Sequence, residues 1–123
     1  MGAPAEFALA SYGCPVCGHC EGPLVARPGR RPCPQCLADL GQLERSHHDA
    51  TTDAVLRGIA TRAREGRARG GELGDPSLRE LGRERQQWLE ALRRRPREER
   101  RDALLAAFAH GFASWAGGDA RWD

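Results

Sequence analysis

The chain has 123 residues, of which 40% are hydrophobic and 29% are charged, and its formal net charge is +2. This length has room for one small domain, and because much of the apolar content is alanine, a large hydrophobic core is excluded. All 19 basic residues are arginine, so mechanisms that need a Walker-A, Schiff-base or kinase lysine are excluded as well. No run approaches the roughly 20 apolar residues that span a bilayer, and the first residues lack the pattern of a signal peptide. We therefore expect a cytoplasmic protein with no membrane partner.

The most specific pattern in the chain is a pair of C-x2-C motifs. Cys14 and Cys17 form the first pair, Cys33 and Cys36 form the second, and 15 residues separate them. In the cytoplasm closely spaced cysteines bind metals more often than they form disulfides, and this spacing is typical of a four-cysteine zinc site. We predict a Zn²⁺-binding module over residues 12–46, with these four cysteines as the ligands.

The two halves of this module differ in local structure. Pro15 and Gly18 suit a zinc knuckle, because glycine adopts positive φ and lets backbone amides point at sulfur. An apolar run at residues 23–26 and turn residues at 27–30 predict a short β-hairpin between the pairs. Pro34 suits the first position of a helix, whose N-terminal dipole favours thiolates. Knuckle, hairpin and ligand-bearing helix together resemble the treble-clef zinc finger, with the zinc ribbon as the nearest alternative. The resemblance implies a small metal-bound α+β module and no particular function.

Two further residues are alternative ligands, the fifth cysteine, Cys20, and its neighbour His19. The pattern formed by Cys14, Cys17, Cys20 and Cys33 resembles the ferredoxin-type ligand set of a [4Fe-4S] cluster. Another set would use Cys17, Cys20, Cys33 and Cys36, and His19 would complete a Cys3His set. Four ligands close a tetrahedral zinc shell and leave no position for water, so a structural role for zinc is expected.

The leader, the helices and the linker are assigned from periodicity and turn chemistry. Residues 1–11 form a flexible leader, and leucines at intervals of three predict a helix from Pro34 to about Ser46. A second amphipathic helix is predicted over residues 47–64. Glycines then punctuate residues 65–75, which indicates a flexible, basic linker.

The C-terminal half is predicted to be all-α. A helix begins at Asp75-Pro76 and a tight connection falls at Pro96, because proline disfavours helical geometry in the residue before it. The last helix stops at Gly117-Gly118. We predict an antiparallel helical hairpin over residues 76–117, followed by a tail at 118–123. The apolar stripes of the hairpin offer a surface for a homodimer.

Arginine clusters are the candidates for binding nucleic acid, since arginine contacts phosphates. The six candidate residues are Arg62, Arg64, Arg67, Arg69, Arg94 and Arg97. The alternative is that they form ordinary solvated helix surfaces, in which codon bias favours arginine over lysine.

No catalytic motif is found in the sequence. The serines lack a G-x-S-x-G context, and Glu98 and Glu99 lie among arginines, which indicates solvated ion pairs. We predict a non-enzymatic zinc-binding adaptor or regulatory protein that contacts nucleic acid or a nucleic-acid-associated protein. The alternatives are an iron-sulfur redox or sensor protein and a dimerising accessory subunit of a larger complex.

Overall fold

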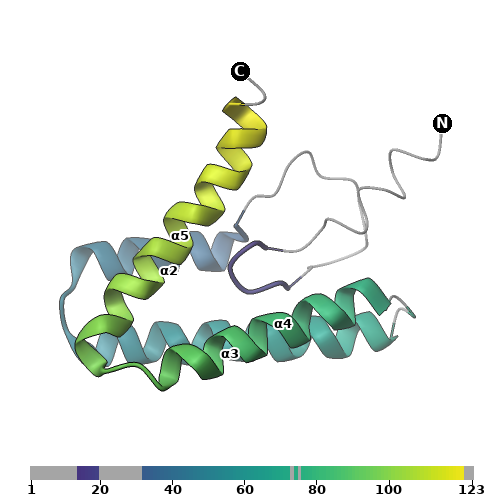
Figure 1. The fold of residues 1–123 in the computed structure, drawn as a ribbon, viewed down its shortest axis with the longest axis horizontal. Helices are drawn as coiled ribbons and strands as arrows, with labels where there is room; N and C mark the ends of the chain where they lie inside the picture. Colours follow the sequence, from purple (N-terminus) through teal and green to yellow (C-terminus); the bar gives the residue numbers. More distant parts are fainter. Residues whose placement is uncertain (1–13, 20–31, 73, 75, 121–123) are drawn as a thin grey trace.

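The computed structural model describes residues 14–19, 32–72, 74 and 76–120, and of residues 77 and 111–120 it describes the backbone alone. Its four helices, labelled as in Figure 1, are α2 (Pro34–Arg45), α3 (Asp49–Glu72), α4 (Pro76–Arg93) and α5 (Arg97–Ala120). α3 and α4 lie side by side and antiparallel, α2 lies above the left part of this pair, and α5 rises away from the end of α4 (Figure 1). The turn at residues 14–19 lies beside α2, above the α3–α4 pair.

The predicted α+β fold class is wrong for the described part of the chain, which contains helices and no strand. The β-hairpin predicted between the two cysteine pairs falls on residues 20–31, which lie outside the described residues, as does the leader at 1–11. The hairpin was expected because an apolar run at residues 23–26 is followed by turn residues at 27–30. In the described part of the chain, the turn at residues 14–19, here called the cysteine turn, packs directly into the helical core.

Local chemistry explains where α2 begins and ends. Pro34 occupies the start of the helix, and the side chain of Cys33 caps it by accepting a hydrogen bond from the Cys36 amide. Ser46 leaves helical geometry at φ −131°. Arg101 of α5 donates to the carbonyl oxygens of Leu43 and Ser46, at 2.8 Å for the shorter bond to Leu43. These bonds satisfy carbonyls that a helix end leaves without partners.

The glycines of the predicted linker lie inside a helix. α3 continues to Glu72, so residues 65–72 are helical rather than linker. A Cβ atom at Gly70 would lie 2.6 Å from the backbone nitrogen of Arg79, and one at Gly82 would lie 2.5 Å from Cβ of Arg67. Distances this short show that the two backbones approach each other closely. The glycines therefore serve helix packing, in which a missing side chain is what matters.

α4 pairs with α3, not with α5 as the predicted hairpin over residues 76–117 required. Gln86 of α4 donates a 2.7 Å hydrogen bond to the carbonyl oxygen of Ala60 in α3. The break predicted at Pro96 is present, since α4 ends at Arg93 and α5 begins at Arg97. α5 then diverges from α4 (Figure 1).

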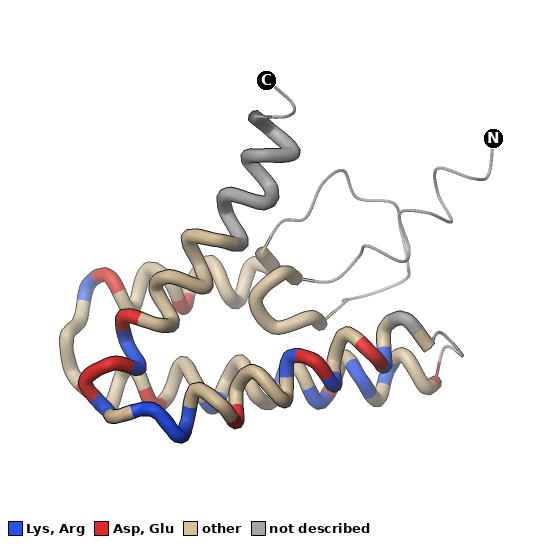
Figure 2. Tube along the Cα trace, in the orientation of Figure 1, with Lys and Arg blue, Asp and Glu red and all other residues tan. Residues whose placement is uncertain are grey.

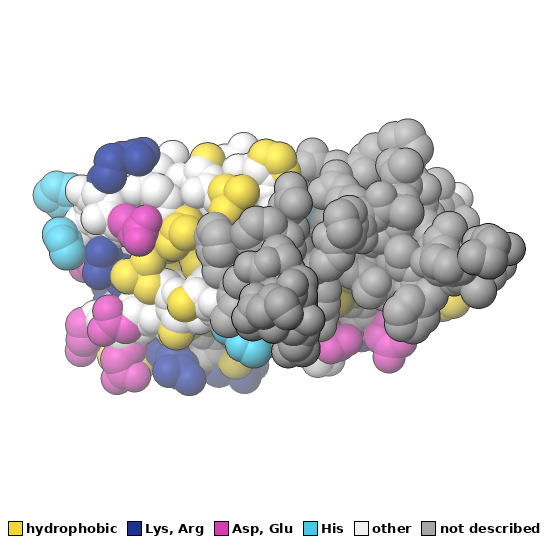
Figure 3. Space-filling model, turned by 90° about the horizontal axis from the view of Figure 1, so that it is seen from above, with side chains coloured by type: hydrophobic (Ala, Val, Ile, Leu, Met, Phe, Trp, Pro, Cys, Tyr) yellow, Lys and Arg dark blue, Asp and Glu magenta, His cyan; other side chains and the backbone are white. Residues whose placement is uncertain are grey.

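The hydrophobic core draws on all four helices and on the cysteine turn. Its largest fully buried side chains include Leu43 of α2, Ile59 of α3, Leu89 of α4, and Leu104 and Phe108 of α5. Seen from above, hydrophobic side chains gather in the left half of the molecule, with charged side chains at its left end and along its lower edge (Figure 3).

None of the described helices combines the length and the apolar character that a membrane-spanning segment needs.

Replacing two adjacent glycines of α3 should have opposite effects on stability. Gly70→Ala should destabilise the protein by about 1–3 kcal/mol, because the new methyl overlaps the α4 backbone. Gly71→Ala should stabilise it by up to about 1 kcal/mol, because the nearest atom at Gly71 is 3.4 Å away on a flexible arginine side chain and alanine favours helix. Urea unfolding of both variants measures the difference. Equal effects would contradict the close packing of α3 on α4.

Candidate metal centre

The four cysteines of the two C-x2-C pairs lie together in the structure. Their Sγ atoms are all within 4.8 Å of one another, and the side chains of Cys17 and Cys33 approach to 3.9 Å. All four residues are at most 3% exposed. None of them forms a disulfide with a described residue. Four buried thiols that converge on one point could bind a metal ion.

The turn after Cys14 presents backbone amides to the sulfurs. Gly18 has φ of 79°, as predicted, and its amide donates a 2.7 Å hydrogen bond to the carbonyl oxygen of Cys14. The amides of Val16 and Cys17 point at Cys14 Sγ at 3.3 and 3.5 Å, and the amide of His19 points at Cys17 Sγ at 3.4 Å. Such N–H···S contacts favour the deprotonated thiolate.

The second pair is held by the start of α2. Cys33 caps the helix, and its Sγ accepts the amide of Cys36 at 3.4 Å. Cys36 lies in the first turn, where the partial positive charge of the helix N-terminus favours thiolates. The prediction that the second pair sits at a helix start is confirmed.

The crowded thiols differ in how readily they ionise. The hydrogen bond from Cys17 lowers the pKa of Cys14, and the same partnership raises the pKa of Cys17. Hydrogen bonds with Cys14 and Cys17 raise the pKa of Cys36. Like charges this close repel in a buried site. A bound cation would therefore be needed to keep all four sulfurs deprotonated.

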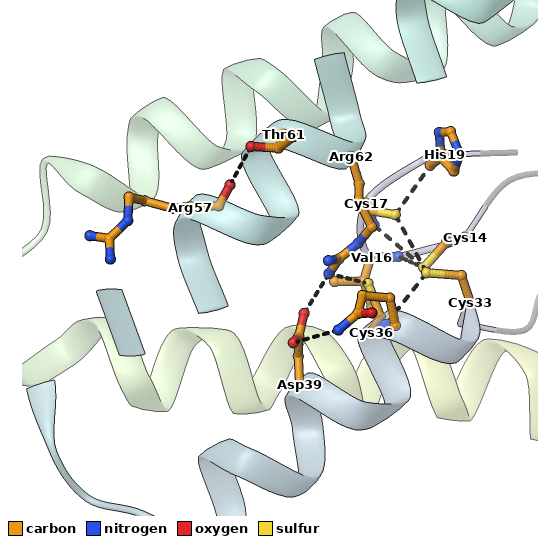
Figure 4. Close-up of polar contacts among 11 residues, drawn as sticks. Cys14, Val16, Cys17, His19, Cys33, Cys36, Asp39, Arg57, Thr61 and Arg62 are labelled. Atoms are coloured by element: carbon orange, nitrogen blue, oxygen red, sulfur yellow. Dashed lines mark hydrogen bonds and ion pairs between the residues drawn. The ribbon is translucent and has the colours of Figure 1, made fainter. Parts of the chain in front are cut away.

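An arginine and an aspartate adjoin Cys36, as Figure 4 shows. The guanidinium of Arg62, from α3, donates to Cys36 Sγ at 3.2 Å and forms an ion pair with Asp39 of α2. Burial acts to lower the pKa of Arg62, but the interactions with Cys36 and Asp39 outweigh burial and leave that pKa above its ordinary value. Arg62 is thus a fixed positive charge beside the sulfurs.

Asp39 is a site residue that the sequence pattern did not single out. It follows Cys36 by three residues, and residues three apart are neighbours on a helix surface. That spacing is the signal that could have pointed to it. Nothing in the sequence showed that Arg62, from a different helix, would meet both residues.

The cysteine turn also packs on α3 and α4. A Cβ atom at Gly66 would lie 2.9 Å from Cα of His19, and one at Gly18 would lie 2.8 Å from Cγ of Arg85. All four cysteines belong to the same buried cluster as the leucines of the helices. The candidate site is therefore an integral part of the helical core.

Of the two alternative ligands, Cys20 and His19, the structure describes His19 alone. Cys20 lies outside the described residues. His19 is half-buried and lines an open depression of 420 Å³ together with Gln35, Thr61, Arg62 and Glu65. The group of described residues that could hold a metal consists of the four cysteines alone.

The six arginine candidates occupy varied environments. Arg62 is bound to Cys36 and Asp39, and the exposed Arg97 forms a 2.8 Å ion pair with Asp53. Arg64, Arg67 and Arg94 are exposed, whereas Arg69 is half-buried. Acidic residues are interspersed with the arginines along the helices (Figure 2). The structure therefore does not bring the six together on one basic surface.

No protein-family model, curated protein or solved structure matches this chain.

Gly18→Ala should destabilise the protein more than Gly74→Ala. Both glycines have positive φ, at 79° and 70°, which costs a residue with a side chain about 1–2 kcal/mol. Gly18 also abuts Leu81 and Arg85, whereas no atom lies within 4 Å of a Cβ at Gly74. Urea unfolding free energies of the two variants measure this. An equal destabilisation in both would show that the turn is not packed against α4.

Proposed function

We propose that Cys14, Cys17, Cys33 and Cys36 hold one zinc ion and that this ion stabilises the fold of a non-enzymatic binding protein. The observation that carries the proposal is the convergence of four buried sulfurs within 4.8 Å. Tetrahedral zinc with bonds of about 2.3 Å places its sulfurs roughly 3.8 Å apart. The 3.9 Å approach of Cys17 and Cys33 agrees with that spacing.

A zinc ion in this position would link distant parts of the chain. It would join the turn at residues 14–19 to the start of α2, inside a core that α3, α4 and α5 also share. Because an unfolded chain has no preformed site for the ion, the free energy of metal binding would become free energy of folding. For a chain with little apolar surface to bury, this is a substantial contribution.

Two features favour a binding role over catalysis. Four thiolates saturate zinc and leave no position for a reacting water. The cavity of 380 Å³ beside Trp88 and His110 is lined by described residues that include no acid, serine or cysteine. These lining residues thus offer no hydroxyl, thiol or carboxylate to complete a catalytic set with His110.

The iron-sulfur alternative makes different demands on the cysteines. In a [4Fe-4S] cluster each cysteine binds a different iron, so the sulfurs stand further apart than around one ion. The set with Cys20 would also leave Cys36 unused, although its sulfur lies beside those of Cys14, Cys17 and Cys33. These points favour a single ion.

Metal analysis tests the site directly. The purified protein should carry one zinc per chain and be colourless. Cys36→Ser should remove the zinc and lower the melting temperature, because a buried ligand is removed, whereas Cys20→Ser should keep both unchanged. A brown protein with iron and sulfide, or a Cys20→Ser variant that loses its metal while Cys36→Ser keeps it, would contradict the proposal.

For the partner of this binding protein, we propose nucleic acid, contacted by exposed arginines. Arg64 and Arg67 of α3 are exposed, and neither forms an ion pair with a described acidic residue. Phosphates attract such side chains. The clusters also carry acidic residues, so the expected affinity is modest and sensitive to salt.

The chain should bind single- or double-stranded nucleic acid at low salt, measured by fluorescence anisotropy. The combined variant Arg64→Gln/Arg67→Gln should reduce the slope of log K against log[salt] by about 0.9 for each duplex phosphate that the variant no longer neutralises. Arg97→Gln is the matched control, because Arg97 is already paired with Asp53. An absence of binding at low salt would rule out a nucleic-acid partner and leave a protein partner.

A further inference from the structure

We propose that Arg62 is a positioning residue of the metal centre, which supplies the hydrogen bond that the backbone cannot supply to Cys36 and so makes metal binding tighter and this thiolate less reactive. The inference rests on the proposed zinc site.

The hydrogen bonds to the four sulfurs are unequal. Within the described residues, backbone amides donate to the sulfurs of Cys14, Cys17 and Cys33. Cys36 Sγ instead accepts from Nη2 of Arg62, at 3.2 Å. Backbone amides thus donate hydrogen bonds to three of the sulfurs, and a side chain from another helix donates to the fourth.

The continuation of α2 explains this difference. After Cys17 the chain turns at Gly18, and the amide of His19, two residues after that cysteine, is available to its sulfur. The equivalent amide after Cys36 belongs to Ala38, inside α2. Helical amides donate to the carbonyl four residues earlier, so this amide is already used. A helix at this position requires an external donor for Cys36.

Arg62 is held in place for that role. Its side chain is 14% exposed, and its ion-pair partner Asp39 is 8% exposed. Gln35 donates in turn to Asp39 at 3.4 Å, from one turn earlier in α2. The chain of contacts runs from Gln35 through Asp39 and Arg62 to Cys36. Figure 4 shows its part from Asp39 through Arg62 to Cys36. Anchored partners of this kind orient metal ligands in other proteins.

The charges are consistent with the same role. A zinc ion with four thiolates carries a net charge of −2, which is costly in a buried site. The guanidinium lies next to one of these sulfurs and also forms an ion pair with Asp39. Hydrogen bonds from an ionised donor are roughly twice as strong as neutral ones. The hydrogen bond from Arg62 to Cys36 Sγ should therefore help hold this ligand in a zinc-loaded site.

The test compares the full-length chain with Arg62→Gln, which keeps a polar side chain and removes the charge. Zinc affinity, measured by competition with a chromophoric chelator, should fall 10- to 100-fold. Arg57→Gln, on an exposed position of the same helix, is the matched control and should stay within twofold of the unaltered protein.

A second measurement separates positioning from mere stabilisation. Iodoacetamide labelling of the zinc-loaded proteins, resolved by peptide mass spectrometry, should show faster alkylation of Cys36 relative to Cys14 in Arg62→Gln. A purely structural role would speed both cysteines equally. If Arg62→Gln does not fold, as judged by circular dichroism, Asp39→Asn takes its place. This substitution removes the anchor of the guanidinium and should also raise the alkylation of Cys36 relative to Cys14.

Unchanged zinc affinity together with an unchanged Cys36 to Cys14 ratio would overturn the inference, as would an equal increase at both cysteines. Failure of the proposed function is recognised separately. In that case the unaltered protein itself would carry no zinc.

Discussion

The mutual repulsion that four buried thiolates would exert is the constraint on which the rest of the structure depends. Their sulfur atoms lie within 4.8 Å of one another, in a cluster that is continuous with the hydrophobic core. Thiolates this close disfavour one another's charge. The surrounding chain counters this with backbone amides, with the start of α2 and with the guanidinium of Arg62. Each of these groups stabilises negative charge at one of the sulfurs. Stabilised thiolates of this kind are what a cation site needs.

Close packing brings these groups to the cysteines. α3 carries both Arg62 and Gly66, and the absence of a side chain at Gly66 lets the cysteine turn approach to within 2.9 Å of where its Cβ would be. Further along the same helix, Gly70 admits the start of α4. The same helix thus seats the turn, supplies a charge to the site and pairs with α4. Disrupting that packing would remove the external donor from Cys36 as well.

Arginine has several distinct structural roles in this chain. Arg62 serves a sulfur and a carboxylate, Arg97 pairs with Asp53, and Arg101 completes the end of α2. Each uses the planar, forked guanidinium, which donates several hydrogen bonds at once. A high arginine content is therefore no measure of nucleic-acid binding here, because these members are engaged within the protein.

The sequence by itself determined the local features of the site. The C-x2-C spacing, the positive φ at Gly18, the helix start at Pro34 and the break at Pro96 all follow from residue chemistry within a few positions. Only the tertiary structure decided the pairing of α3 with α4 and the partners of Arg62. The physical reason is that a glycine looks the same in a linker and in a tight helix contact, and an arginine looks the same whether it faces water or sulfur. What faces each of them comes from residues far away in the chain, and periodicity along the sequence carries no record of it.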